Sequence, residues 1–179
     1  MILDLQHIDP QRIAAIDSSG AELRYAEISQ LSKHITSLIP TRSLCFLLVE
    51  NNVGGIAWVM SMLDSRQLVP LILNVKTEDT LYQQLLHTYQ PTYICAPNHF
   101  AVQGEVVDCQ YEYTLTKISD TTPTLYGELS HLLPTSGSTG SPKLVRHKYG
   151  NIEAAGLNIS TFFELKESDR PLMVLPLYY

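Results

Sequence analysis

Two kinds of hydrophobic pattern alternate along this chain, and their order predicts an α/β fold. Continuous apolar runs, at Ser43 to Val49, Leu68 to Leu73 and Thr92 to Cys95, are typical of strands that a parallel sheet buries on both faces. Between them, Val53 to Ser65 and Glu78 to Tyr89 carry apolar residues at helical spacing. Strands that are separated by helices form βαβ units, so we expect a parallel sheet with right-handed crossovers.

The first part of the chain predicts a hairpin and a helix before these strands. Arg12 to Asp17 and Glu22 to Tyr25 flank the turn sequence Ser18-Ser19-Gly20, as in a β-hairpin. Residues Ala26 to Ile39 have an apolar stripe at helical spacing, and Pro40 ends this helix.

The second half is less regular. Alternation typical of strands runs from Val102 to Leu115, and the polar segment Asp120 to Pro123 looks like a linker. Asn151 to Phe163 has helical spacing, and Leu172 to Leu175 predicts a further buried strand. The whole pattern predicts an α/β fold: a three-layer sandwich in which helices flank a mostly parallel sheet that is incomplete at its C-terminal edge.

Some expectations concern single side chains. Asn51 and Asn52 are candidates to cap the helix from Val53, and Trp58 is expected to pack in the core. Tyr111 and Tyr113, two positions apart, are expected on one face of a strand. The residues expected to face inward on the helix from Val53 are Ile56, Val59, Met60 and Leu63.

Composition fits one globular domain. Of 179 residues, 45% are hydrophobic and 17% are charged, which allows a real core and excludes the composition of a disordered segment. A net charge of −6 argues against binding to nucleic acid. No apolar run approaches the roughly 18 residues of a membrane span. The N-terminus, which has no basic region, does not resemble a signal peptide, so we expect a cytoplasmic protein.

Cysteines and histidines give no sign of a metal site. Cys45 and Cys95 lie inside apolar runs and are expected to be buried free thiols, and Cys109 stands apart from both. The six histidines show no ligand spacing with cysteine or carboxylate, so no bound metal is expected from this pattern.

The most informative polar segment runs from Thr135 to Lys143, with the sequence Thr-Ser-Gly-Ser-Thr-Gly-Ser-Pro-Lys. Glycines allow backbone N–H groups to line an anion-binding nest, hydroxyls add donors, and Lys143 adds a positive charge. Further basic residues follow closely at Arg146, His147 and Lys148. These features are typical of polyphosphate binding, and the alternative is a plain surface turn.

The segment matches neither of the common phosphate loops. In the P-loop the lysine follows glycine and precedes a hydroxyl, whereas Lys143 follows Pro142 and precedes Leu144. The dinucleotide pattern G-x-G-x-x-G is absent from it as well. A short loop between two strands must bind phosphate through amides, hydroxyls and lysine alone.

The segment resembles the phosphate-binding signature of the adenylate-forming enzymes, the AMP-dependent synthetase/ligase superfamily that includes acyl-CoA synthetases. Their pattern reads roughly (S/T)-S-G-(S/T)-T-G-x-P-K-G-V, and Thr135 to Lys143 plus Val145 match it. Three other segments look similar to family segments in the same order: Leu23 to Ile28 to L-T-Y-x-E-L, Leu63 to Leu71 to a helix–turn–strand segment, and Leu175 to Tyr179 to the start of L-P-L-(F/Y)-H-x-x-G.

The resemblance implies a reaction and its cofactors. Such enzymes use ATP and Mg²⁺ to activate a small carboxylic acid as an acyl-adenylate and release pyrophosphate. The acyl group then passes to coenzyme A or to the phosphopantetheine of a carrier protein, and fatty acid metabolism is one setting of this chemistry. No nucleophile, base or acid is visible in this chain, and the chemistry requires none from this region.

The resemblance also implies roles for residues. The residues expected at the ATP phosphates are Thr135, Ser136, Gly137, Ser138, Thr139, Gly140 and Lys143. Tyr178 and Tyr179 are expected to wall the substrate pocket, the alternative being two tyrosines at a frayed chain end. Two departures from the family pattern stand out: Leu144 replaces the glycine after the lysine, and Tyr179 replaces the usual histidine.

The later family segments, Y-G-x-T-E and the adenylation lysine, do not occur in this sequence. We therefore expect residues 1–179 to be the N-terminal subdomain of the AMP-binding domain of a longer ligase, inactive alone and prone to self-associate through Leu172 to Leu177. One alternative is a non-catalytic nucleotide-binding module or degenerate relative. Another is a structural domain whose loop binds phosphate opportunistically.

Overall fold

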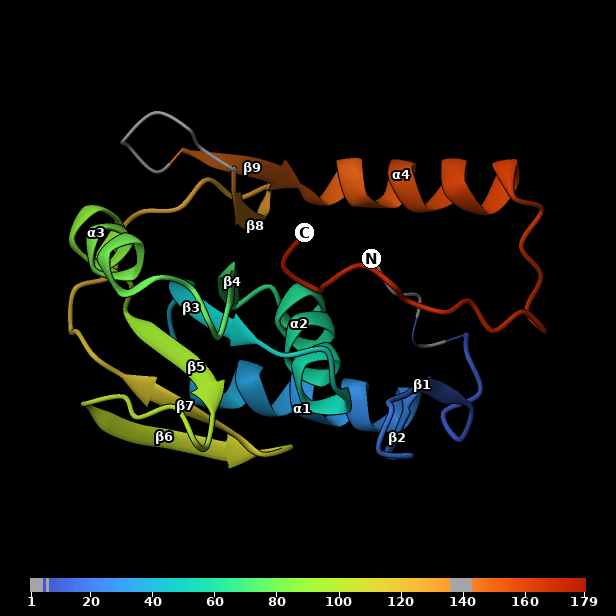
Figure 1. Cartoon of the computed structure of the whole chain (residues 1–179), viewed down its shortest axis with the longest axis horizontal. Helices are drawn as coiled ribbons and strands as arrows, with labels where there is room; N and C mark the ends of the chain where they lie inside the picture. Colours follow the sequence, from blue (N-terminus) through green and yellow to red (C-terminus); the bar gives the residue numbers. More distant parts are fainter. Residues whose placement is uncertain (1–4, 6, 136–142) are drawn as a thin grey trace.

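A computed structural model of the chain describes residue 5, residues 7–135 and residues 143–179 (Figure 1). The main sheet has the strand order β6-β7-β5-β3-β4-β8-β9. Its central strands are parallel: β5 (Tyr93–Pro97), β3 (Ser43–Val49), β4 (Leu68–Asn74) and β8 (Leu129–Pro134). Antiparallel strands lie at the edges: β7 (Tyr113–Lys117) and β6 (Glu105–Gln110) beside β5, and β9 (Leu144–Lys148) beside β8.

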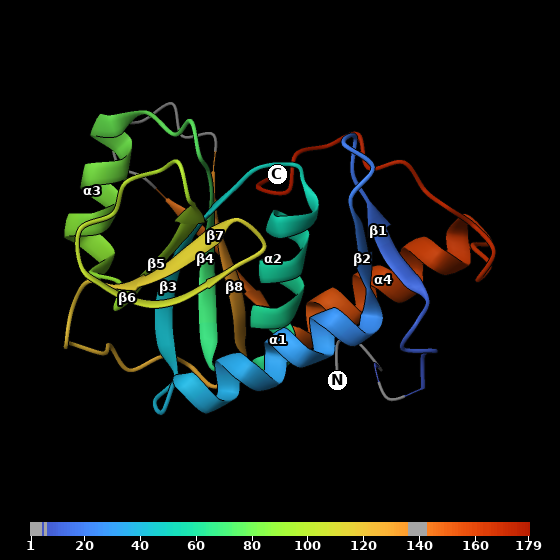
Figure 2. The same cartoon turned by 90° about the horizontal axis from the view of Figure 1, so that it is seen from below.

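Helices cover both faces of this sheet (Figure 2). Helices α1 (Tyr25–Leu38) and α2 (Val53–Ser65) pack on one face, and α3 (Asp79–Tyr89) packs on the other. Strand β3 contributes to both cores because its side chains alternate: Cys45, Leu47 and Val49 face α1 and α2, whereas Leu44, Phe46 and Leu48 face α3. The predicted three-layer α/β sandwich is confirmed.

The remaining elements lie beside the sheet. Strands β1 (Ile13–Ile16) and β2 (Glu22–Arg24) form the predicted antiparallel hairpin. Helix α4 (Tyr149–Phe162) follows β9 and extends away from the sheet, as Figures 1 and 2 show. No helix in the described parts of the chain has both the length and the apolar character needed to cross a bilayer.

The side chains of α2 pack differently from the prediction. Ile56 and Met60 are only partly buried, whereas Ala57, Trp58 and Met62 are fully buried. The predicted inward stripe is therefore wrong in part, because α2 is enclosed by α1 and the sheet and its core-facing surface lies partly on another side. The expected core position of Trp58 is confirmed, and its indole N–H donates to the carbonyl of Gln110 at 3.1 Å.

Asn52 caps α2, as predicted, since its side-chain oxygen accepts from the amide of Gly55 at 2.8 Å. Cys45 and Cys95 are buried and free, also as predicted. Burial raises the pKa of both thiols, so neither is a reactive nucleophile at neutral pH.

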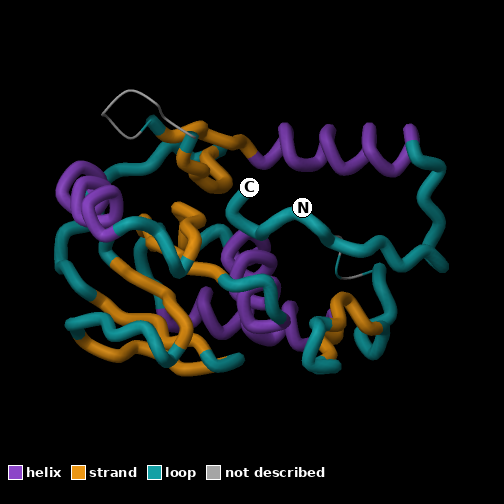
Figure 3. Tube along the Cα trace, viewed as in Figure 1, coloured by secondary structure: helices purple, strands orange, loops and turns teal. Residues whose placement is uncertain are grey.

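Two sequence predictions about strands are wrong. The predicted strand Leu172 to Leu175 is irregular (Figure 3), and Leu172 is 86% exposed. A strand needs a neighbouring ladder, and none of the described strands pairs with this segment. Tyr111 and Tyr113 do not share a strand face, because Tyr111 lies in the turn between β6 and β7 with φ of 53°.

Candidate functional site

The carboxyl ends of the parallel strands meet at one edge of the sheet, where open α/β sheets bind ligands. β3 ends at Val49 and leads into Glu50 and Asn51. β4 and β8 are in register at Leu71 and Leu132, so Asn74 and Thr135 follow three residues further along each strand. The predicted phosphate segment therefore begins at this edge.

The segment from Thr135 to Lys143 closes a hairpin between β8 and β9. The amide of Thr135 donates to the carbonyl oxygen of Lys143 at 2.9 Å, and the Thr135 hydroxyl donates to the same oxygen at 3.1 Å. Pro134 pairs with Leu144 just before this closure. The prediction that two strands flank this segment is confirmed, and the Thr135 hydroxyl bonds to Lys143 where the strands meet. Ser136, Gly137, Ser138, Thr139 and Gly140 lie outside the described residues.

Leu144 has a packing role at the position where the family signature has glycine. Its side chain is partly buried against the core cluster beneath α3. Lys143 beside it is exposed. The backbone of this pair is held by the hairpin, and the lysine side chain stays in solvent at the end of the loop.

The basic residues after the loop lie along β9. Successive side chains of a strand point to opposite faces, so Arg146 and Lys148 lie on one face of β9 and His147 on the other. Lys148 lies over the ring of Tyr126, with its Nζ atom 5.7 Å from the ring centre. The basic residues that are consecutive in sequence are therefore divided between the two faces of β9.

A pair of stacked imidazoles supports the base of the hairpin. The rings of His131 on β8 and His147 on β9 are parallel, with centres 4.4 Å apart. The Ser130 hydroxyl donates to the carbonyl oxygen of His147 at 2.9 Å. Burial, and secondarily His147, lowers the pKa of His131 to about 4, so His131 is neutral at physiological pH.

A cavity of about 380 Å³ lies at the same sheet edge, between the ends of β3 and β4 and the C-terminal segment. Its lining includes Asn51, Asn74, Lys76 and Tyr178. The amide of Leu177 donates to the side-chain oxygen of Asn51 at 3.0 Å, and this bond holds the segment in place. The structure thus brings Tyr178 to the edge and leaves Tyr179 82% exposed.

Asn51 and Lys76 line the candidate site, and the sequence analysis does not identify either of them as a site residue. The sequence pattern indicates a helix cap at Asn51 and assigns no role to Lys76. The available signal is their position: each lies two residues after the end of a parallel strand. Within the described residues, no three His, Cys, Asp or Glu side chains are grouped so that they could hold a metal ion.

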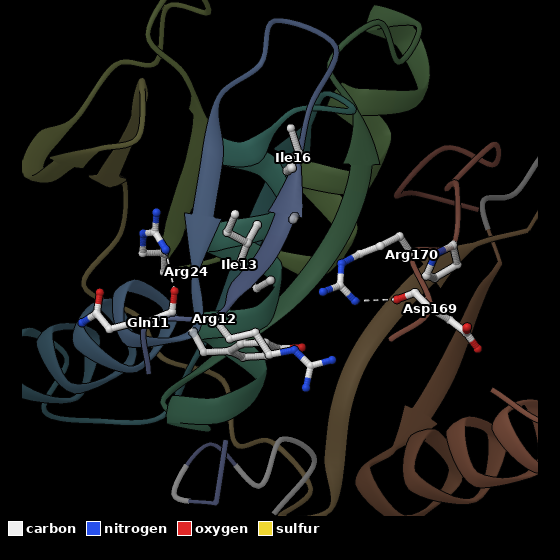
Figure 4. A pocket seen from close by; sticks show the side chains of 11 residues that line it. Gln11, Arg12, Ile13, Ile16, Arg24, Asp169 and Arg170 are labelled. Atoms are coloured by element: carbon white, nitrogen blue, oxygen red, sulfur yellow. Dashed lines mark hydrogen bonds between the residues drawn. The ribbon is translucent and has the colours of Figure 1, made fainter. Parts of the chain in front are cut away.

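A larger cavity, of about 710 Å³, lies far from the loop, between β1 and residues 169–171 (Figure 4). Arg12 and Arg170 extend into it, and Arg24 lies at its rim. Arg12 pairs with Glu167 at 3.4 Å, and Arg170 donates to the backbone carbonyls of Glu167 and Asp169. Arg12 therefore ties the C-terminal segment to the start of the hairpin, whereas the bonds of Arg170 stay within that segment. Size alone does not make this cavity the functional site.

Comparison with known proteins finds likeness at the level of structure only. No family model matches the sequence, and no curated protein matches it either. Among solved structures, o-succinylbenzoate CoA synthetase (MenE) from Bacillus subtilis in complex with the acyl-adenylate intermediate OSB-AMP matches with a TM-score of 0.76 at 21% identity, over 99% of this chain and 49% of that one.

Two further solved structures agree. MenE from Bacillus subtilis in complex with ATP and magnesium ion has a TM-score of 0.73 at 19% identity, over 99% of this chain and 51% of that one. Apo MatB from Rhodopseudomonas palustris has a TM-score of 0.73 at 15% identity, over 97% and 39%. The chain spans about half the length of the MenE chains. The chain, with its mostly parallel sheet and covering helices, has the fold of the N-terminal part of the adenylate-forming enzymes.

Proposed function

We propose that residues 1–179 are the N-terminal subdomain of the AMP-binding domain of an ATP-dependent acid–thiol ligase. The observation that carries this proposal is the closure of the Thr135 to Lys143 segment at the carboxyl edge of the sheet. A Gly/Ser/Thr-rich sequence held at that edge, in a fold shared with a MenE structure that contains ATP and magnesium ion, fits a polyphosphate better than a plain surface turn.

The proposed role of the segment is to stabilise the departing pyrophosphate. When a carboxylate attacks the α-phosphorus of ATP, negative charge grows on the β- and γ-phosphates. The hydroxyls of Ser136, Ser138 and Thr139 would donate hydrogen bonds to these phosphates. Gly137 and Gly140 would allow the backbone to approach closely, and Lys143 would supply positive charge. Mg²⁺ bound together with ATP would neutralise part of this negative charge.

Tyr178 is the proposed wall of the acid pocket, since it lines the cavity at the ends of β3 and β4. Tyr179, which is exposed, would contribute only where further chain covers it. The acyl-adenylate would then pass to the thiol of coenzyme A or of a carrier protein.

The test is pyrophosphate–ATP exchange by a longer protein that contains this chain, assayed with a panel of aliphatic, aromatic and dicarboxylic acids. We expect exchange that depends on one class of acid, followed by acyl transfer to coenzyme A or to a phosphopantetheine carrier. ATP binding without exchange for any acid would instead indicate a nucleotide-binding module. Absence of ATP binding would indicate a structural domain and refute both.

The 179-residue chain alone is expected to be inactive, because its sequence lacks the Y-G-x-T-E segment and the late lysine of the family pattern. Purified chain should release no pyrophosphate from ATP, with or without acids. Acid-dependent release that is lost on changing Lys143 would show that the expected inactivity is wrong.

A further inference from the structure

Strand β1 has an open edge. It forms a two-stranded antiparallel sheet with β2, separate from the main sheet, and no other strand in the described part of the chain pairs with it. A two-stranded ribbon has marginal stability by itself, and the unpaired backbone groups of an edge are a template for a further strand. The open edge of β1 is therefore a place where an extended segment can add.

The cavity of about 710 Å³ runs along this edge (Figure 4). All four residues of β1, Ile13–Ile16, line it. Successive side chains of a strand point to opposite faces, so a cavity that four consecutive residues line follows the backbone rather than one face. At a rise of about 3.3 Å per residue this stretch is about 13 Å long, which suits about four residues of an extended peptide.

The opposite wall of the cavity does not supply the missing strand. Residues 169–171 form this wall and adopt no regular secondary structure. Pro171 among them has no amide hydrogen that it could donate to a strand. The cavity thus separates the open edge of β1 from a wall that cannot pair with it.

The lining of the cavity carries an excess of positive charge, although the whole chain has a net charge of −6. Three arginines, Arg12, Arg24 and Arg170, line the cavity, and the carboxylate of Asp169 is the one acidic group in its lining. Guanidinium groups bind carboxylates through paired hydrogen bonds. The charge of the lining therefore complements an acidic ligand.

The present partners of these arginines compete weakly with such a ligand. Arg12 bonds to the carbonyl and the carboxylate of Glu167, whose side chain is 95% exposed, and Arg24 pairs with the exposed Glu22 at 3.1 Å. Exposed ion pairs contribute little to stability. Arg170 donates to backbone carbonyls of its own segment. A carboxylate that enters the cavity can therefore engage these guanidinium groups at low cost.

The positions of two arginines set a direction for the added strand. Arg12 precedes β1 and Arg24 pairs with Ile13, so both belong to the amino end of β1. In an antiparallel ladder, which is the more stable arrangement, the carboxyl end of an added strand lies at that end of β1. We propose that the open edge of β1 binds the acidic carboxyl-terminal tail of a partner protein as an antiparallel third strand. Main-chain hydrogen bonds provide affinity in this mode, and the arginines provide specificity.

The test is binding of fluorescent hexapeptides to the 179-residue chain, which does not depend on the ligase function. The probe is Thr-Val-Thr-Val-Glu-Glu with a free carboxyl end. One control is Thr-Val-Thr-Val-Gln-Gln amide, and the other is Glu-Glu-Thr-Val-Thr-Val amide, which has its acidic residues at the amino end. We expect saturable binding of the probe that is about tenfold tighter than that of either control, the ratio expected from one charge-assisted hydrogen bond.

Hydrogen exchange locates the binding. The bound probe should slow amide exchange in residues 13–16, because an added strand takes up the outward amides of β1. Equal affinity for all three peptides, or no saturable binding of the probe, would overturn the proposal. Slowed exchange at β6 or β9, the edge strands of the main sheet, in place of β1 would overturn it as well.

A matched pair of variants tests the arginines. Arg12→Gln should weaken binding of the acidic probe about tenfold and leave binding of the Gln-Gln peptide unchanged. Arg146→Gln, on β9 and outside the cavity lining, should change neither affinity. Circular dichroism first confirms that each variant is folded, and Arg170→Gln replaces Arg12→Gln if that variant is not. Unchanged affinity of the folded lining variant for the acidic probe would refute the proposed recognition.

Discussion

The amide and the hydroxyl of Thr135 both donate to one atom, the carbonyl oxygen of Lys143, at 2.9 and 3.1 Å. These two hydrogen bonds to a single acceptor hold the two ends of the proposed phosphate segment against each other. It uses the backbone of Lys143 and leaves the lysine side chain exposed. The charge of Lys143 can therefore be removed without breaking the closure of the hairpin.

Gly54→Ala should destabilise the fold. The added methyl would overlap the Tyr111 carbonyl oxygen and lie 2.8 Å from the Tyr113 ring, and overpacking of this kind costs about 1–3 kcal/mol. The matched control is Gly150→Ala, where an added Cβ meets nothing within 4 Å and the residue lies in a helix. Urea unfolding should show a loss of stability for Gly54→Ala and none for Gly150→Ala. Similar unfolding midpoints for both variants would mean that the turn is not packed tightly against α2.

Stability should fall as pH drops from about 6.5 towards 4. The folded state keeps His131 neutral, with a pKa of about 4 against an ordinary 6.5, so the unfolded chain takes up a proton in this window and gains stability relative to the fold. His131→Gln should flatten the dependence of unfolding free energy on pH there. The control is Asp17→Asn.

Asp17 titrates at a lower pH than His131, so its substitution changes the stability in a different pH range. Its hydrogen bonds, first from the Ser19 side chain and then from the Val53 amide, lower its pKa from 3.8 to about 2. The stability that Asp17 provides is therefore present above pH 4 and lost as pH falls towards 2.

A pH profile of stability between 6.5 and 4.5 that His131→Gln leaves unchanged would show that the buried imidazole does not control this pH dependence.

The 179-residue chain should self-associate. Phe162 is 80% exposed, Leu172 86% and Val174 77%, which is an unusual density of large apolar side chains for a free surface. Sedimentation velocity should show an average mass that rises with concentration, and the double change Leu172→Ser and Val174→Ser should reduce that rise. A single monomeric species at all concentrations would contradict this expectation.

The sequence predicted best where one local pattern decides the structure. The apolar run Ser43 to Val49 became β3 with the same bounds, because a strand buried on both faces leaves no polar position to shift it. Val53 to Ser65 became α2 because Asn52 caps its first turn. Leu172 to Leu175 failed since a strand also needs a partner, which the local pattern does not report.

The candidate site was harder to predict because it depends on register between strands. Asn74 and Thr135 reach the same edge of the sheet only because Leu71 pairs with Leu132, and that pairing is set by packing across the sheet. Lys148 looked close to the loop in sequence, yet it lies at the far end of β9 against Tyr126. The signature of the loop was visible in the sequence, whereas the residues around it were not.

The most direct measurement compares two half-reactions of Lys143→Ala in a longer protein that contains this chain. Pyrophosphate–ATP exchange reports adenylate formation, and capture of a synthetic acyl-adenylate by the thiol reports the second step. Removing one charge from a preorganised anion site costs about 3 kcal/mol, or about 10²-fold in rate. We expect Lys143→Ala to slow exchange by about 10²-fold and to leave thiol capture nearly unchanged, because pyrophosphate has already left before the second step. Equal losses in both half-reactions would contradict it and reduce the segment to a support of the fold.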